Sequence, residues 1–327
     1  MRLCAVLYVY KGEWGLPSID FECLRVLCLV KFTRCPVTIE TNSNPLRSGA
    51  GKLPYLQIGN EKFVGYRQIK KLLDKEGYPI DAKLKQKEKH LSESFSNWVF
   101  TNLHAYYHYF VFGEPNNFEI TRSFYAKRTP FPFNFYYPSS YQKEAYDIVY
   151  TMGGFDIDDK LELHEGDYLT NNAKKCINVL SKRLGRNVWF FGDQFSELDA
   201  IVFSYLSILS KITLPNNPIQ NHIKGCQNLV YFINRISRDV FKKEIFNSIN
   251  TSKDDASPNN PLLTATERKF LESEKKTKIL AGIAAVVAMS SFAAMKIFFK
   301  KKFSNTQEYY DGLNYDDDDE FEEDDMD

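Results

Sequence analysis

Two histidines stand at a spacing that could serve a metal ion. His104 and His108 are four residues apart, which on a helix brings both imidazoles to one face. No Glu between them makes the His-Glu-x-x-His order of zinc hydrolases, and their neighbours are Tyr106, Tyr107 and Tyr109. We therefore expect packed or surface histidines and predict no metal site.

The six cysteines offer little redox chemistry. They form neither a Cys-x-x-Cys pair nor the dense set of a disulfide-bonded domain. Cys23 and Cys28 lie five apart on a predicted helix that faces the core, so we expect inert, reduced thiols. No glycine-rich phosphate loop and no Ser/His/Asp arrangement stands out. We predict neither catalytic nor cofactor-binding residues.

The first eighty residues alternate between short strands and helices. Runs rich in β-branched and aromatic residues predict four strands: Leu3–Val9, Val37–Ile39, Leu53–Ile58 and Lys62–Val64. One helix follows Ser18, its expected N-cap, with Asp20 and Glu22 in its first turn. A second helix is predicted over Tyr66–Lys75. This order suits a mixed sheet of the thioredoxin-like kind over residues 1–80, in which Pro54 would follow a cis peptide bond.

Residues 81–247 are predicted to be all-helical. Helical stretches are expected at Lys83–Phe112, Tyr168–Leu184 and Ala200–Ser210. The first should pack through one side, formed by Leu91, Phe95, Trp98, Val99, Leu103 and Tyr106. Ser196 and Asp199 form a predicted capping box before the third helix. That helix is apolar on nearly every face, so we expect it at the centre of the core.

The segment Ile279–Phe299 is the strongest single signal. Its twenty-one residues would span roughly 31 Å at 1.5 Å per residue, close to the hydrocarbon thickness of a bilayer. Lysines flank it on both sides. The predicted anchor (278–299) includes Ile279, Ala285, Val287, Phe292, Met295 and Phe299. A buried core helix is the alternative, but a polar linker (248–277) precedes the segment and an acidic tail (300–327) follows it.

The position and composition of this segment predict a tail anchor. With so little chain behind it, the segment would insert after translation, with the body in the cytosol and the tail across the membrane. Short, Ala-rich and bordered by lysines, the segment resembles the tail anchors of outer mitochondrial membrane proteins; the endoplasmic reticulum and the peroxisome remain alternatives. The N-terminus has neither a secretory signal nor a presequence pattern.

Charge is divided unevenly along the chain. Lys+Arg and Asp+Glu both total 42, but the part from Phe303 to Asp327 holds twelve acidic residues and no basic one. The rest is therefore basic, which suits an anionic membrane surface or acidic partners. Nucleic acid is the rival partner, and we predict none because the basic residues are scattered. The tail is expected to be solvated, with binding of a basic partner as the alternative.

An aromatic stretch, Phe118–Tyr141, contains the run PFPFNFYYP. Such a segment usually packs against its own domain. If part of it is exposed, it would form a docking patch, because Tyr and Phe dominate interface hot spots.

The whole pattern resembles a glutathione transferase, and its finer motifs resemble the metaxin family. The motifs are Gly15-Leu16-Pro17-Ser18, Ser43-Asn44-Pro45 before Leu53-Pro54, Pro130 to Phe135, and Phe190 to Asp193 with Leu198-Asp199-Ala200 and Phe203 to Leu206. The similarity covers about 300 residues. The C-terminal segment resembles that of the anchored metaxins rather than their anchorless partners.

The resemblance raises the question of glutathione chemistry. A transferase needs a hydroxyl or thiol near the end of the first strand, for which Tyr8, Tyr10 and Ser18 are candidates. It also uses an acidic-Ser pair at the next helix to hold the γ-glutamyl group. Here the sequence is Gly65-Tyr66-Arg67-Gln68. We therefore predict that the chain is not an enzyme.

By its resemblance to metaxins, the protein is expected in the sorting and assembly machinery of the mitochondrial outer membrane, acting in protein import and β-barrel insertion. Its implied partners are a second metaxin of the anchorless type, the β-barrel assembly protein and transport adaptors, with no cofactor. The alternatives are a tail-anchored transferase-like enzyme and an adaptor of mitochondrial shape or transport.

Overall fold

The computed structural model describes residues 5–41, 48–49, 51–128, 135–153, 163–242, 244 and 295. Contacts divide the chain into two units, Met1–Asp255 and Ala256–Asp327. Met295 is the only described residue of the second unit. The fold below is that of the first.

The N-terminal half is the mixed sheet that the sequence predicts. Its strands are β1 (Ala5–Val9), β2 (Val37–Thr41), β3 (Tyr55–Ile58) and β4 (Glu61–Val64), in the order β2-β1-β3-β4. The first pair is parallel, and β3 runs antiparallel to both β1 and β4. The Leu53–Pro54 peptide bond at the entry to β3 is cis.

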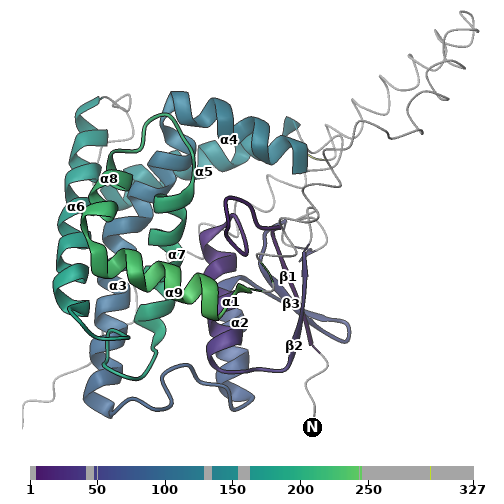
Figure 1. The fold of residues 1–327 in the computed structure, drawn as a ribbon. Coiled ribbons are helices and arrows are strands. Elements are labelled where there is room, and N and C mark those ends of the chain that lie inside the picture. Colours follow the sequence, from purple (N-terminus) through teal and green to yellow (C-terminus); the bar gives the residue numbers. More distant parts are fainter. Residues whose placement is uncertain are drawn as a thin grey trace, which may run out of the picture. The chain divides into compact units, whose positions relative to one another are not determined.

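Two helices cover the face of this sheet that is turned toward the helical half (Figure 1): α1 (Phe21–Phe32) and α2 (Gly65–Lys75). Nine of the twelve residues of α1 are buried, because the helix packs between the sheet and a helix of the other half. Burial of each apolar side chain contributes roughly 1.5–3 kcal/mol to stability, so α1 stabilises the contact between the two halves.

The start of α1 differs from the prediction. Asp20, not Ser18, is the N-cap, and its carboxylate accepts the Cys23 N–H at 2.8 Å. Ser18 is fully buried, and its hydroxyl has no hydrogen-bond partner within the described part of the chain. Asp and Ser cap helices about equally well, so the local sequence does not choose between them.

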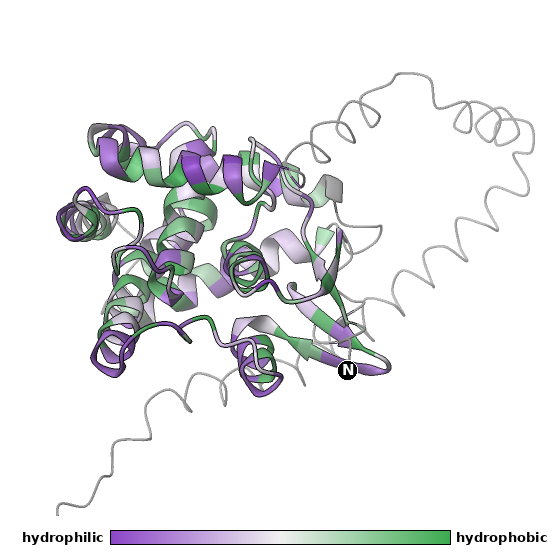
Figure 2. Ribbon diagram, turned by 60° about the horizontal axis from the view of Figure 1, so that its bottom comes forward, coloured by the Kyte–Doolittle hydropathy of each residue, from purple (hydrophilic) through white to green (hydrophobic). Residues whose placement is uncertain are grey.

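The described elements of the C-terminal half are helices, apart from two isolated β-bridges, Trp189–Gly192 and Phe191–Gln194. This half contains α3 (Gln86–His108), which continues as a π-helical turn η2 (Tyr109–Gly113), then α4 (Pro115–Arg128), α5 (Tyr137–Gly153), α6 (Leu163–Leu184), α7 (Glu197–Lys211), α8 (Pro218–Gly225) and α9 (Gln227–Asp239). The predicted packed side of α3 holds except at Leu91, which is 36% exposed. In Figure 2 hydrophobic stretches face the inside of this unit and hydrophilic ones face outward.

The helix α7 lies at the centre of the core, with twelve of its fifteen residues buried. Its N-terminus has the capping box: Ser196 Oγ accepts the Asp199 N–H at 3.4 Å, and the Asp199 carboxylate accepts the Ser196 N–H at 2.9 Å. Asp199 also accepts the Phe190 N–H at 3.0 Å. Its carboxylate therefore joins the preceding loop to the buried helix start.

No helix within the described ranges combines the length and the apolar character needed to cross a membrane. The predicted anchor and acidic tail lie outside the described residues, apart from Met295.

Candidate functional site

The junction between the two halves gathers charged side chains around Glu197, the first residue of α7. Its carboxylate accepts Arg25 Nη2 at 2.6 Å and the Tyr66 hydroxyl at 2.9 Å. The Arg25 guanidinium also lies 3.6 Å from the centre of the Tyr66 ring. The Glu197 N–H donates to Asp81 at 2.8 Å. Glu197 thus connects α7 to α1 and α2 through its carboxylate and to the linker between the halves through its backbone N–H.

A polar hollow of about 240 Å³ lies beside this junction. Its lining comes from α2, the linker, α3 and α7, and consists of Lys70, Asp74, Pro79, Ile80, Asp81, Lys89, Glu93 and Glu197. Lys70 Nζ lies 3.8 Å from Glu197 and donates to Asp74 at 3.0 Å. Lys70 thus offsets two of the four carboxylates that border the hollow.

The N-terminus of α2 is occupied by a carboxylate of the same chain. Glu22, from the first turn of α1, accepts the Tyr66 N–H at 2.8 Å. A Cβ at Gly65 would lie 3.2 Å from the same Glu22 oxygen, and Gly65 has a φ of +80°, so glycine lets the two helices approach. The exposed N–H groups of a helix start attract anions. At the start of α2 the attracted anion is the Glu22 carboxylate of the same chain.

Burial raises the pKa of Glu22, while the Tyr66 N–H and the cations Lys52 and Arg25 oppose the rise. The sequence indicated Glu22 only as a partner for the dipole of its own helix. Nothing local could show that its side chain reaches a residue 44 positions further on.

Two of the three candidate hydroxyls of a transferase are engaged or enclosed, those of Tyr10 and Ser18. The Tyr10 hydroxyl lies 2.7 Å from the Tyr141 hydroxyl, and burial together with Tyr141 raises the Tyr10 pKa well above its ordinary value. The Tyr8 ring stacks on Tyr55 with centroids 4.5 Å apart. Ser18 is buried completely.

Both histidines are packed among aromatic rings. His104 is 4% exposed, its Nδ1 lies 2.9 Å from the Tyr205 hydroxyl, and the His104 and His108 rings meet edge to face at 4.5 Å. Burial lowers the pKa of His104 well below its usual range and that of His108 to about 4. Neutral, packed imidazoles are thus favoured at both positions. Within the described ranges, no group of three His, Cys, Asp or Glu side chains could hold a metal ion.

Four of the five described cysteines are buried: Cys23, Cys28, Cys35 and Cys176. Burial raises the pKa of Cys35 to about 11 and that of Cys176 to about 12, and it raises those of Cys23 and Cys28 as well. Since the thiolate is the reactive form, burial makes these thiols unreactive.

The described part of the aromatic stretch mostly packs inward. Tyr125 and Tyr137 are buried, and Phe124 stacks on Trp14 with centroids 4.5 Å apart. Phe135 is 69% exposed. Pro130 to Asn134 lie outside the described residues, so the choice between packing and docking stays open for the centre of this stretch.

The fold and this junction define a glutathione-transferase-like protein. Residues 173–236 match the family model of the glutathione S-transferase C-terminal domain, and residues 23–142 match that of the outer mitochondrial membrane transport complex protein. Among solved structures, a β-etherase of Sphingobium sp. is 12% identical, with a TM-score of 0.49, over 77% of this chain and 100% of that one.

Two curated relatives are closer in sequence. The metaxin-1 homolog of Drosophila melanogaster is 66% identical over 319 residues, which is 97% of either chain. Metaxin-1 of Macaca fascicularis is 32% identical over 284 residues, covering 86% of this chain and 87% of that one. The chain belongs to the metaxin family, and the resemblance drawn from its motifs is confirmed.

Proposed function

We propose that this protein is a non-catalytic subunit of the mitochondrial outer-membrane sorting and assembly machinery, acting by binding in protein import and β-barrel insertion. Its family membership and its match to the outer mitochondrial membrane transport complex model support this assignment. The observation that carries the non-catalytic part is the contact between Glu22 and the N-terminus of α2.

Glutathione would compete with the protein itself at that position. Its γ-glutamyl carboxylate would have to displace Glu22 from the Tyr66 N–H, leaving two like charges close together in a poorly solvated place. The candidate hydroxyl of Tyr10 already pairs with Tyr141. Glu22 therefore blocks substrate capture at the start of α2, and the existing hydrogen bond of the Tyr10 hydroxyl disfavours thiolate stabilisation by that group.

The remaining parts of the proposal concern membrane topology and partners. Ile279–Phe299 anchors the chain in the outer membrane, with residues 1–247 in the cytosol and the acidic tail in the intermembrane space. A second metaxin of the anchorless type and the β-barrel assembly protein are its partners. Transport adaptors bind the same cytosolic part, residues 1–247. Confinement to the membrane raises the effective concentration of the body near the barrel complex.

Affinity purification of the full chain from solubilised mitochondria tests this function. We expect the second metaxin and the β-barrel protein to co-purify, and alkaline carbonate to leave the chain in the membrane. A deletion of 279–299 serves as the control and should be released by carbonate. Absence of both partners from the purified material would contradict the proposal.

A glutathione conjugation assay with a standard electrophile addresses the enzyme alternative. We expect no turnover by the full chain above that of the Tyr8→Phe, Tyr10→Phe and Ser18→Ala variants. Turnover that any of these substitutions abolishes would identify a transferase instead.

A further inference from the structure

Acidic residues are missing from two long segments of the helical half. Neither residues 168–192 nor residues 200–238 contain any Asp or Glu. The same segments contain nine basic residues: Lys174, Lys175, Lys182, Arg183, Arg186, Lys211, Lys224, Arg235 and Arg238. They cover α6 from Tyr168 onward with most of the loop after it, α7 from Ala200 onward, α8, and α9 up to Arg238. Such segregation is not expected of an ordinary solvated surface, where both signs are interspersed.

The fold assembles the outer residues of these segments into one surface. Lys175, Lys182 and Arg186 are exposed and lie seven and four residues apart, so they share one side of α6 or its immediate end. The α8 helix lies beside them, since His222 Nε2 is 2.9 Å from Asn178 Oδ1. Asn228 fixes α9 to the end of α6 by donating to the Ser181 carbonyl at 2.8 Å.

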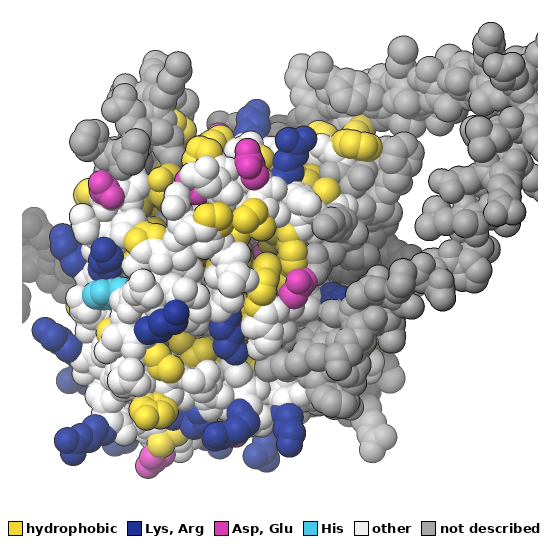
Figure 3. Space-filling model, turned by 45° about the horizontal axis from the view of Figure 1, so that its top comes forward, with side chains coloured by type: hydrophobic (Ala, Val, Ile, Leu, Met, Phe, Trp, Pro, Cys, Tyr) yellow, Lys and Arg dark blue, Asp and Glu magenta, His cyan; other side chains and the backbone are white. Residues whose placement is uncertain are grey.

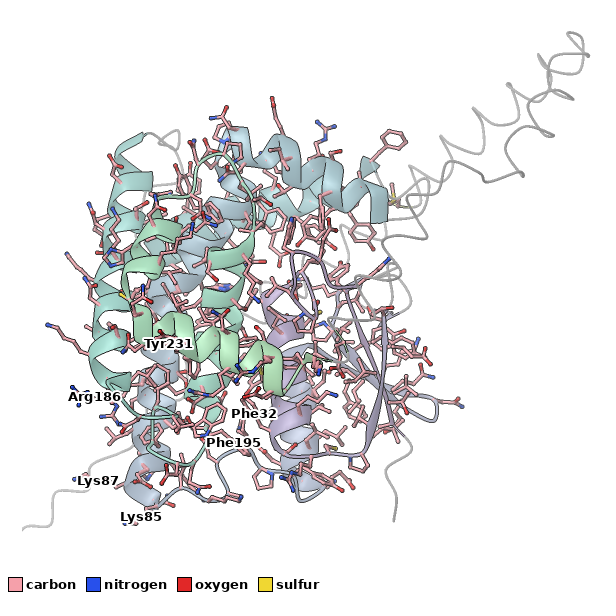
Figure 4. The ribbon with its side chains drawn as sticks, in the orientation of Figure 1. Phe32, Lys85, Lys87, Arg186, Phe195 and Tyr231 are labelled. Carbon is pink, nitrogen blue, oxygen red and sulfur yellow. The ribbon has the colours of Figure 1, made fainter. Side chains whose placement is uncertain are left out.

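We call this surface the basic face. It comprises Lys175, Val179, Lys182, Arg186, Val188, Lys224 and Tyr231, all exposed. Figure 3 shows Lys and Arg side chains along the left margin of the molecule, the side of α6 in Figure 1. In Figure 4 Arg186 lies at the same end of the helical half as Lys87 of α3 and its N-cap Lys85, with Tyr231 above them on α9.

The cations of the basic face are not neutralised by the fold. Among the described residues, no carboxylate pairs with Lys175, Lys182 or Arg186, and Lys224 reaches only the Gln220 amide oxygen at 3.4 Å. Lys182 lies in the last turn of α6, where a cation interacts favourably with the helix dipole, so its presence there has a structural reason. The same reason does not apply to Lys175, which lies two turns earlier, or to Lys224, which lies on another helix.

Apolar side chains are exposed among these cations. Tyr231 is 69% exposed, Val188 44% and Val179 41%. Arg235 donates to the Val188 carbonyl, which holds the loop against α9 and keeps Val188 and Tyr231 on one surface. Cations mixed with an exposed tyrosine and small apolar groups are the composition that a membrane-water interface accommodates.

We propose that the basic face docks on the anionic phosphate headgroups of the membrane that holds the chain. Lys175 and Lys182 lie seven residues apart, about 10 Å along α6, and Arg186 and Lys224 lie outside that helix. The charge is therefore spread over a broad surface rather than focused on one ligand. A lipid surface is equally extended. The inference rests on the proposed membrane attachment, because docking needs the body to be held close to lipid.

Reconstitution of the full chain in lipid nanodiscs tests this docking. An environment-sensitive fluorophore is attached through Asn234→Cys, one turn beyond Tyr231, after replacing Cys4 and Cys226 by Ser. The buried thiols of Cys23, Cys28, Cys35 and Cys176 stay unlabelled because burial raises their pKa values. Discs of phosphatidylcholine alone are compared with discs containing about one third phosphatidylinositol.

We expect a blue shift of the probe on the anionic discs only, and its loss at high salt. Each basic group near an anionic surface strengthens attachment by about fivefold. The pair Lys175→Glu and Lys182→Glu should therefore reduce the ratio of docked to free body by at least about 25-fold.

The matched control is Lys71→Glu with Lys75→Glu on α2, also two exposed lysines of which one lies in the last helical turn. This control should leave the shift unchanged. Circular dichroism of all variants checks that each is folded.

The other outcomes overturn the proposal. An equal shift on neutral discs would mean that charge does not direct the contact. A shift caused by soluble polyglutamate but not by anionic discs would assign the face to an acidic protein. Co-elution with discs reports attachment separately: a chain that elutes with neutral discs without any anionic shift is anchored but not docked, whereas one that fails to elute with them contradicts the anchor.

Discussion

The N-terminus of α2 and the basic face use charge in opposite ways. At α2 the attraction for an anion is satisfied by Glu22 of the same chain. On the basic face, Lys175, Lys182 and Arg186 have no carboxylate partner among the described residues. The anion-binding position at the start of α2 is thus filled by the chain itself, while the cations of the basic face are left for a partner outside the described residues.

This comparison predicts that charges satisfied inside the fold carry its stability. Asp199→Ala should have the largest effect, because the N–H groups of Phe190 and Ser196 would be buried without a partner. We expect a loss of about 4 kcal/mol in the free energy of unfolding. Urea denaturation measures it, with Ser196→Ala, at about 1 kcal/mol, as the milder control. Equal losses of unfolding free energy in the two variants would contradict the larger role that we assign to Asp199.

The same residue predicts a pH dependence. Burial raises the pKa of Asp199 from 3.8 to about 7, so between these values the folded state keeps a proton that the unfolded state loses. The free energy of unfolding should therefore fall as pH rises from about 4 to 7. Asp199→Asn should flatten this fall in part, since Asp20, whose pKa is also raised to about 7, contributes in the same direction. A profile that rises over this range in the parent chain would refute the assignment.

Arg25→Met should have the next largest effect. It leaves Glu197, whose side chain is 14% exposed, without its closest cation. We expect a loss of about 3 kcal/mol. The double variant with Glu197→Gln should lose less than the two single losses added together, because both remove the same contact. Simple additivity in this cycle would show that the two side chains act independently.

Glu22→Ala should cost about 2 kcal/mol, because the Tyr66 N–H loses a charged acceptor. Glu22→Gln is the control and should cost less, since the amide oxygen still accepts that hydrogen bond. Glutathione should raise the melting temperature of the Ala variant, whose helix start is vacated, and leave the parent unchanged. If glutathione stabilises the parent equally, Glu22 does not close the position.

The exposed cations should have the smallest effect on stability. Lys175→Glu with Lys182→Glu should change the free energy of unfolding by no more than about 0.5 kcal/mol, as should Lys71→Glu with Lys75→Glu. The two pairs are compared by thermal unfolding in detergent. A loss of several kcal/mol in the first pair alone would make the basic face a structural device rather than a binding surface.

The sequence alone determined the features that depend on neighbouring residues. The strand and helix order of the first half, the helix at Glu197–Lys211 and its capping residues Ser196 and Asp199 follow from short-range periodicity and capping rules. The family was also recognisable, because its motifs are short runs in a fixed order. The sequence did not determine that Asp20 rather than Ser18 is the N-cap, since both residues satisfy the same local rule.

Only the tertiary structure decided which distant groups meet. Glu22 reaches the N-terminus of α2, and Arg25 meets Glu197 across 172 positions of sequence. The basic face likewise required α6, α8 and α9 to lie side by side, although its basic residues are visible in the sequence. Such contacts depend on packing between elements, and the spacing of residues along one element carries no information about them.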